Sequence, residues 1–237
     1  MKYKEIISVI NSGSFSAKGK TFRLTGTITV KEVEFFKKLI TKEMKVIDIG
    51  VGKGVSTALF SSICNENVYG IDPFQTIEHL NSCEILCETL EIKKPVIIEK
   101  RTIECFNEPI LENVKFDFIF VDGYHTFDAT LLDFLILEDS LKDGGMIAFH
   151  DCYYRSKQKA INFILKNRDY EMLEDTVEPN LGIVSRIARS LYHALFKYKT
   201  NLALTFKLLK PHRTDSSLVI LRKKSDYKPF YNEYFDF

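Results

Sequence analysis

Five short apolar runs, each followed by a longer helical pattern, constrain the fold of this chain more than any other feature. Runs rich in Val, Ile and Phe that alternate with helices predict a parallel sheet covered by helices on both faces. The predicted strands are 45–50, 68–72, 95–100, 116–122 and 144–151. The predicted helices are 55–64, 75–90, 102–106, 126–141 and 156–167. The sequence therefore predicts an α/β protein with a Rossmann-like, doubly wound, mostly parallel seven-stranded sheet.

The last two strands are harder to place than the first five. Segments 170–177 and 181–187 flank a turn at 178–180, and this pattern predicts an antiparallel hairpin, which we favour for strands six and seven. The segment 216–223 competes for one of these positions. The predicted organisation is an N-terminal helical cap or lid over 1–40, a core domain over 41–188 and a basic amphipathic extension over 189–237.

Glycines gather where the first predicted strand ends. Ligands of such sheets bind beyond the carboxyl ends of the strands. Here the chain runs from Asp48 to Gly54 as D-I-G-V-G-K-G, directly before a helix. Glycines let the backbone approach a ligand closely, and the start of the helix offers free N–H groups. Asp72 ends the second strand, twenty positions after Gly52, where an acid can accept hydrogen bonds from both hydroxyls of a ribose.

The glycine spacing separates two classes of nucleotide-like cofactor. A dinucleotide site prefers G-x-G-x-x-G, which would need glycine at position 55, where this chain has Val55. The spacing is instead G-x-G-x-G, with Asp48 two residues before the first glycine. A glycine-rich turn that binds no ligand is the alternative, and the succession of strand, loop, helix, strand and terminal acid argues against it.

The segments VIDIGVGKGVST, VYGIDPF, FDFIFVDGYHTFDATLLDF and LKDGGMIAFHD resemble class I S-adenosylmethionine-dependent methyltransferases. Within that group they are most similar to small-molecule O-methyltransferases with a D-G-x-H motif after strand four and H-D after strand five. The resemblance covers roughly residues 25–187. It implies S-adenosylmethionine as the cofactor and a hydroxyl of a small molecule or sugar as the methyl acceptor.

The resemblance also implies roles for individual residues. The loop glycines would pass beneath the methionine part and the ribose of the cofactor, and Asp48 would orient the loop and meet the cofactor's amino group. Asp72 would hold the ribose hydroxyls, and Thr102 would flank the adenine. The implied cofactor-binding residues are Asp48, Gly50, Gly52, Gly54, Ser56, Thr57, Asp72, Thr102 and Asp122.

Two carboxylates, Asp122 and Asp151, end the fourth and fifth predicted strands. Neighbouring strands lie ~4.8 Å apart, and like charges this close raise one pKa or recruit a cation. Mg²⁺ suits two carboxylates together with water and substrate oxygens. Family members that bind a metal here usually add a third acid, where this chain has His150, so the predicted metal ligands are Asp122, His150 and Asp151. Alternatively, Asp122 receives only backbone and cofactor hydrogen bonds and Asp151 caps the next helix.

His125 follows Asp122 by three residues, in the loop before a helix. An imidazole placed there could take the proton from a substrate hydroxyl as the methyl group moves. The resemblance points to the same position, so His125 is the predicted general base, and His125 and Asp122 are the predicted catalytic residues. The alternative is a histidine that only enters the helix.

The charge distribution bounds the partners. Thirty-three basic and 32 acidic residues leave a net charge of +1, which argues against a dedicated nucleic-acid binder. Residues 179–214 hold seven basic and no acidic residues in an amphipathic pattern. Peripheral membrane contact through 189–213 and a packing or homodimer contact both stay open. The five cysteines lack CxxC spacing and the N-terminus lacks the pattern of a signal peptide, so we expect a cytoplasmic protein.

The function predicted from the sequence is therefore S-adenosylmethionine-dependent O-methylation of a small molecule or sugar. Three alternatives stay open. They are an NAD-dependent oxidoreductase of Rossmann fold, a methyltransferase acting at the membrane surface on a lipid-linked glycan, and a protein that binds the cofactor without chemistry.

Overall fold

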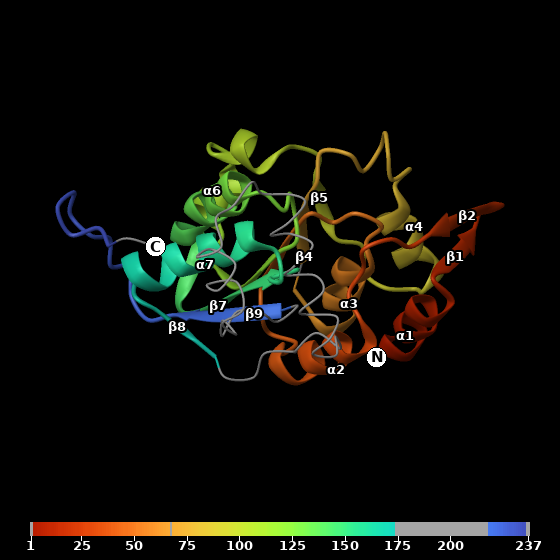
Figure 1. The fold of residues 1–237 in the computed structure, drawn as a ribbon. Helices are drawn as coiled ribbons and strands as arrows, with labels where there is room; N and C mark the ends of the chain where they lie inside the picture. Colours follow the sequence, from red (N-terminus) through yellow and green to blue (C-terminus); the bar gives the residue numbers. More distant parts are fainter. Residues whose placement is uncertain (1, 67, 174–217, 236–237) are drawn as a thin grey trace, which may run out of the picture.

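A computed structural model of the chain describes residues 2–66, 68–173 and 218–235. Its centre is a seven-stranded sheet (Figure 1). The strands follow one another across the sheet as β5 (Val96–Ile98), β4 (Val68–Ile71), β3 (Val46–Ile49), β6 (Phe116–Val121), β7 (Leu141–His150), β9 (Leu218–Lys223) and β8 (Tyr170–Met172). The first five are parallel, and β9 runs antiparallel to both of its neighbours. The predicted fold class is confirmed.

Helices cover both faces of this sheet because its strands are apolar on both sides. Along β6, Phe118 and Phe120 belong to one buried cluster, while Ile119 and Val121 belong to the other. Figure 1 shows α6 and α7 on one side of β7 and β9 and α2 on the other. The first cluster takes side chains from α1 (Tyr3–Ser12), α2 (Val30–Leu39), α3 (Val55–Ile63) and α4 (Ser82–Thr89). The second takes them from α5 (Pro109–Asn113), α6 (Phe127–Leu137) and α7 (Arg155–Asn167).

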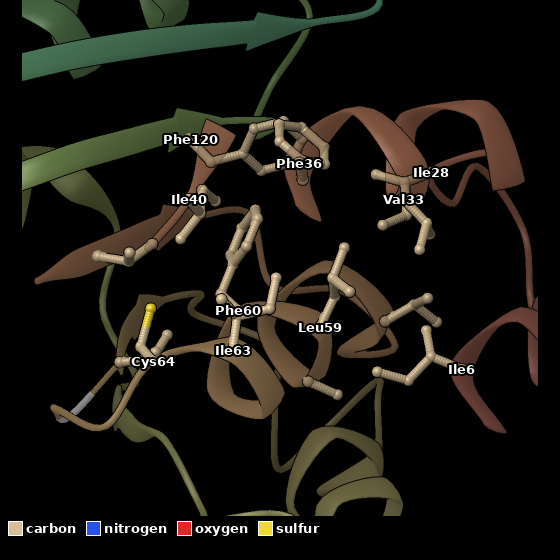
Figure 2. Close-up of a cluster of buried hydrophobic side chains, with 14 of the residues drawn as sticks. Ile6, Ile28, Val33, Phe36, Ile40, Leu59, Phe60, Ile63, Cys64 and Phe120 are labelled. Carbon is tan, nitrogen blue, oxygen red and sulfur yellow. The ribbon is translucent and has the colours of Figure 1, made fainter. Parts of the chain in front are cut away.

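A group of phenylalanines fixes α2 against the sheet (Figure 2). The ring of Phe36 lies 5.3 Å from that of Phe60 and 5.4 Å from that of Phe120, both edge to face. Aromatic pairs in this geometry add ~0.5–1.5 kcal/mol beyond their buried area. Glu32 lies one helical turn before Phe36, so it points to the same side of the helix. The packing of α2 therefore brings a carboxylate to the sheet.

The N-terminal region is less purely helical than the predicted cap over residues 1–40. Between α1 and α2 lies a hairpin of β1 (Ser14–Ala17) and β2 (Lys20–Arg23), stabilised by stacking of Phe15 on Phe22 at 4.8 Å. The predicted helix over 75–90 begins only at Ser82, because Asp72 accepts the N–H of Phe74 and Asn81 has a left-handed backbone. Turns therefore occupy 73–81.

The favoured hairpin for the last two strands is wrong in its second member. β8 pairs with β9, so the competing segment around 216–223 supplies the inserted strand. The run Leu218–Leu221 is continuously apolar and buried, which suits a strand with neighbours on both sides. Residues 218–223 thus extend the core sheet, although the sequence groups them with the C-terminal extension. Segment 181–187 and the basic segment 189–213 lie outside the described residues.

The remaining elements are short. η1 (Thr102–Cys105) follows β5 and η2 (Glu138–Ser140) joins α6 to β7. In the part of the chain that the structure describes, none of the helices combines the length and apolarity needed to span a bilayer.

Candidate active site

The polar residues predicted from the sequence meet at the carboxyl edge of the parallel strands. Register pairs Ile49, the last residue of β3, with Ile71 of β4 on one side and with Val121 of β6 on the other. Asp72 and Asp122 follow these partners directly, so they flank the glycine loop. Asp151 follows β7 in the next position along the same edge.

Two of the three loop glycines are required by packing. Gly50 has φ +88°, and a Cβ there would lie 2.5 Å from the carbonyl oxygen of Asp122. Gly54 has φ +86°, and its Cβ would lie 2.4 Å from the backbone of Cys83. Gly52 has φ +55°, but a Cβ there would meet nothing within 4 Å. The loop therefore leaves open space at Gly52, on which a ligand can lie.

Asp48 is a fully buried carboxylate beneath this loop. One of its oxygens, Oδ2, accepts hydrogen bonds from the hydroxyls of Ser56 at 2.7 Å and Thr57 at 2.6 Å. Burial raises the pKa of Asp48 to about 7, against the lowering effect of these two neutral donors. The other oxygen, Oδ1, has no hydrogen-bond partner among the described residues. A buried acceptor of this kind suits a cationic donor from a ligand.

Asp72 links the glycine loop to the turn that follows β4. Its Oδ2 accepts the N–H of Gly52 at 2.7 Å and its Oδ1 accepts the N–H of Phe74 at 2.8 Å. The amide of Gln75 donates to the carbonyl oxygen of Gly52 at 2.8 Å. His79 Nε2 lies 3.8 Å from Asp72 Oδ2. Asp72 is thus held in one orientation at the edge of the open space.

Thr102 lies beyond β5, buried in η1. Its hydroxyl hydrogen-bonds to the carboxyl group of Asp133 on α6, and burial raises the pKa of that carboxyl to about 6. The Asp133 carboxyl also lies against Gly123, where an added Cβ would meet its Oδ2 at 3.3 Å. Thr102 is therefore tied to the loop after β6 as well as to β5.

His125 and Asp151 form a close pair beyond β6 and β7. The distance from His125 Nε2 to Asp151 Oδ2 is 2.9 Å, and 3.8 Å separates the same nitrogen from Asp122 Oδ1. Burial tends to raise the pKa of Asp151, but the hydrogen bond from His125 and the charge of His150 lower it to about 2. The His125 side chain is 40% exposed, so it is open to a substrate while its partner is held beneath it.

His150 has a different environment, since a carboxylate faces each of its nitrogens. Its Nδ1 lies 3.0 Å from Asp122 Oδ1, and its Nε2 lies 3.2 Å from Glu32 Oε1. Burial alone would lower the pKa of His150, but these two hydrogen bonds raise it to about 10. Burial likewise tends to raise the pKa of Glu32, and His150 with Thr29 keeps it lowered. His150 is thus a buried imidazolium between two carboxylates.

Two residues of this cluster are absent from the sequence prediction. Glu32 belongs to the capping box that starts α2, a pattern that indicates only a helix start. Lys157 on α7 is fully buried, donates to the carbonyl oxygen of His150 at 2.7 Å and lies 3.9 Å from Asp122 Oδ1. The one signal in the sequence is His150 itself, at a position where an acid is expected.

The structure places a second histidine, His125, as close to the two predicted aspartate ligands as His150 is. Ligand atoms of Asp122, His125 and Asp151 all lie within 4.8 Å of one another. His150 is close to the same aspartates, with Nδ1 3.7 Å from Asp151 Oδ1, but both of its nitrogens face carboxylates. Among the described residues, the histidine that stands where an ion would lie is therefore His125.

Residues 47–152 match a protein family described as a methyltransferase domain. The fold is similar to that of an rRNA methylase from Streptococcus thermophilus, with 17% identity, TM-score 0.54 and coverage of 82% of this chain and 95% of that chain. It is also similar to an O-methyltransferase from Bacillus cereus in complex with SAH, with 13% identity, TM-score 0.56 and coverage of 73% and 82%. No curated protein matches the chain in sequence. At these identities the two structures show a shared fold and leave the acceptor open.

Proposed function

We propose that the chain is a class I S-adenosylmethionine-dependent methyltransferase that transfers the methyl group to a hydroxyl oxygen of a small molecule or sugar, and the methyltransferase-domain match over residues 47–152 supports this. The observation that carries this proposal is the pair formed by His125 and Asp151, with 2.9 Å between Nε2 and Oδ2. A half-exposed histidine oriented by a half-buried carboxylate is the arrangement that a general base needs.

The residues beneath the glycine loop fit the cofactor. The unpartnered Oδ1 of Asp48 suits the ammonium group of the methionine part, and the open space at Gly52 suits the ribose. We propose that Asp48, Gly50, Gly52, Gly54, Ser56, Thr57, Asp72, Thr102 and Asp122 hold the cofactor. When bound, S-adenosylmethionine supplies an electrophilic methyl group on a sulfonium.

His125 is the proposed base for the acceptor hydroxyl. Its Nε2–H donates to Asp151, which leaves Nδ1 with a free lone pair, and no described residue hydrogen-bonds to that nitrogen. With the cofactor bound, its methyl group would be the electrophile for the acceptor oxygen, and the sulfur would leave with the electron pair of the broken carbon–sulfur bond. The hydroxyl proton would go to His125 Nδ1. Asp122, 3.8 Å from the ring nitrogen, helps to stabilise the imidazolium that results.

Features of the sequence and of the described structure bear on the other possible acceptors, cofactors and partners. The near-neutral charge favours a small acceptor over nucleic acid, although the structural neighbours include two described as rRNA methylases, one of them as putative. Val55 breaks the dinucleotide glycine pattern, which disfavours NAD. Five buried free cysteines fit a reducing compartment such as the cytoplasm. Membrane contact, a lipid-linked acceptor and a homodimer involve residues outside those described.

Ligand-dependent stability and product formation test the proposal together. S-Adenosylhomocysteine should raise the melting temperature of the wild type, whereas NADH should not. With a panel of hydroxylated small molecules, the His125→Ala variant should retain this shift and lose methyl transfer by about 10²–10⁴-fold. Asp151→Asn should lose part of the rate, because the ring of His125 is then less well oriented. Stabilisation by NADH alone, or unchanged turnover in His125→Ala, would contradict the proposal.

A further inference from the structure

The protonation of His150 follows from its contacts. An imidazole has one donor and one acceptor nitrogen when neutral, and two donors when protonated. Carboxylate oxygens of Glu32 and Asp122 stand at 3.2 Å and 3.0 Å from its two nitrogens. Glu32 accepts the N–H and the hydroxyl of Thr29 on Oε2, and these bonds together with His150 keep the pKa of Glu32 lowered against the effect of burial, so its Oε1 is an acceptor for His150 as well. His150 must therefore donate on both sides, and it has no lone pair left for a metal.

Cations already surround the carboxylate that a metal would need. Asp122 Oδ1 lies 3.0 Å from the imidazolium of His150 and 3.9 Å from the ammonium of Lys157. Lys157 is fully buried and anchored by the carbonyl oxygen of His150 at 2.7 Å, so it is not free to move away. A divalent ion bound to Asp122 would lie close to both positive charges. The donor set therefore does not fit a divalent cation, although Asp122, His125 and Asp151 are near one another.

The charges of the cluster are nearly balanced without an ion. Glu32, Asp122 and Asp151 supply three negative charges, and His150 and Lys157 supply two positive charges. One negative charge remains, which the sulfonium of the proposed cofactor would neutralise. A bound dication would instead leave the cluster positive and repel the sulfonium.

We propose that the imidazolium of His150, held by Glu32 and supported by Lys157, takes the place of a divalent metal and makes this methyltransferase site metal-independent. The proposal rests on the proposed function of the same site. His150 acts as a positioning residue: it fixes Asp122 beside His125 and supplies the positive charge that a metal would otherwise supply. Helix α2, the second helix of the chain, thereby contributes to the site through Glu32.

Binding of Mn²⁺ tests this without any methyl acceptor. Free Mn²⁺ is titrated into the full-length protein with S-adenosylhomocysteine present, and its six-line electron paramagnetic resonance signal is followed. The wild type should leave the signal unchanged. The double variant His150→Asp with Glu32→Gln offers a third carboxylate and removes the imidazolium, so it should bind one equivalent and quench the signal. Lys142→Met, which removes a cation from the opposite end of β7, should behave as the wild type.

Two results would overturn the proposal. One is stoichiometric Mn²⁺ binding by the wild type that Asp122→Asn abolishes. The other is a double variant that shows the wild-type circular dichroism and S-adenosylhomocysteine binding but still fails to bind Mn²⁺. Should the double variant not fold, His150→Gln removes the charge with a smaller change, and the same gain is expected of it at weaker affinity. If S-adenosylhomocysteine binds neither the wild type nor the variants, the proposed function is contradicted instead. The two failures can be told apart because Mn²⁺ binding is measured without catalysis.

Discussion

Two fully buried carboxylates, Asp48 at the start of the glycine loop and Glu32 beside His150, differ in the direction of their pKa shifts. Asp48 accepts hydrogen bonds from two neutral hydroxyls, and burial raises its pKa to about 7. Glu32 is equally buried, but it faces the imidazolium of His150, and its pKa is lowered. The comparison teaches that burial does not decide whether an acid is ionised. The charge of the donors decides it.

The two carboxylates also differ in where their partners come from. Asp48, Ser56 and Thr57 lie within ten residues of one another, along one strand, one loop and the start of one helix. Glu32 and His150 are far apart in the sequence and meet because α2 packs on the sheet through Phe36. The first arrangement is local, and the second depends on the whole fold.

The largest expected effect comes from breaking the second arrangement. Glu32→Leu leaves His150 without one of its two carboxylates in a buried site, and losing one partner of a buried pair costs about 3–5 kcal/mol. Urea denaturation at neutral pH should show a loss of this size in the free energy of unfolding.

The matched control is Lys142→Met, at the other end of β7. Lys142 lies 2.7 Å from Asp117, but its side chain is 43% exposed. An exposed pair contributes only about 0–1 kcal/mol. Equal losses in the free energy of unfolding would mean that the buried pair of Glu32 and His150 stabilises the fold no more than the exposed pair of Lys142 and Asp117. That result would contradict the expected role of Glu32.

The same difference explains what the sequence could predict. Sequence patterns a few residues long predict the five parallel strands, the glycine loop, Asp72 and the aspartates after β6 and β7. The structure places the loop and these aspartates along the carboxyl edge of the sheet. Glu32 and Lys157 were missed because a capping box and a lysine in an amphipathic helix have ordinary local explanations. Only tertiary packing brings them to His150.

Strand β9 was misplaced for a related reason. The apolar run of β9 is visible in the sequence. No short-range sequence pattern, however, indicates that a segment so late in the chain pairs between β7 and β8. Sequential strands pair more often than distant ones, which favoured the hairpin. The choice between the two segments depended on long-range pairing, as did the contact of His150 with Glu32.

A smaller effect is expected where the two halves of the site touch. Gly50→Ala places a Cβ 2.5 Å from the carbonyl oxygen of Asp122 on a backbone with φ +88°. Strain of this kind costs about 3 kcal/mol, from overpacking together with the left-handed backbone, and it should displace Asp122 and weaken binding of S-adenosylhomocysteine. Gly52→Ala has only the backbone cost, about 1 kcal/mol, because no atom lies within 4 Å. Thermal unfolding and calorimetric titration of both variants measure the difference, and equal destabilisation would show that the contact with Asp122 is unimportant.

The smallest expected effect concerns the protonation of Asp48. Burial raises its pKa to about 7 in the free protein, while an ammonium group bound against Oδ1 would favour the ionised form. The bound state then holds fewer protons than the free state below this pKa. The affinity for S-adenosylhomocysteine should therefore rise with pH up to about 7, by at most about tenfold per pH unit, and level off above it. Calorimetry near pH 6 in buffers of different ionisation enthalpy should detect the released proton.

Asp48→Asn separates this effect from other titrations in the site. Asparagine keeps an acceptor for Ser56 and Thr57 but cannot ionise, so the variant should lose the proton release and bind about tenfold more weakly at pH 8, or about 1.4 kcal/mol. The free variant should also be less sensitive to pH, because an acid with a raised pKa in the folded state destabilises the fold as pH increases from about 4 through 7. If affinity is flat across this range in the wild type, Asp48 does not meet the cofactor's ammonium. Asp48 would then differ from Glu32 only in its role in the folded structure, as a neutral buried acid that does not bind the cofactor.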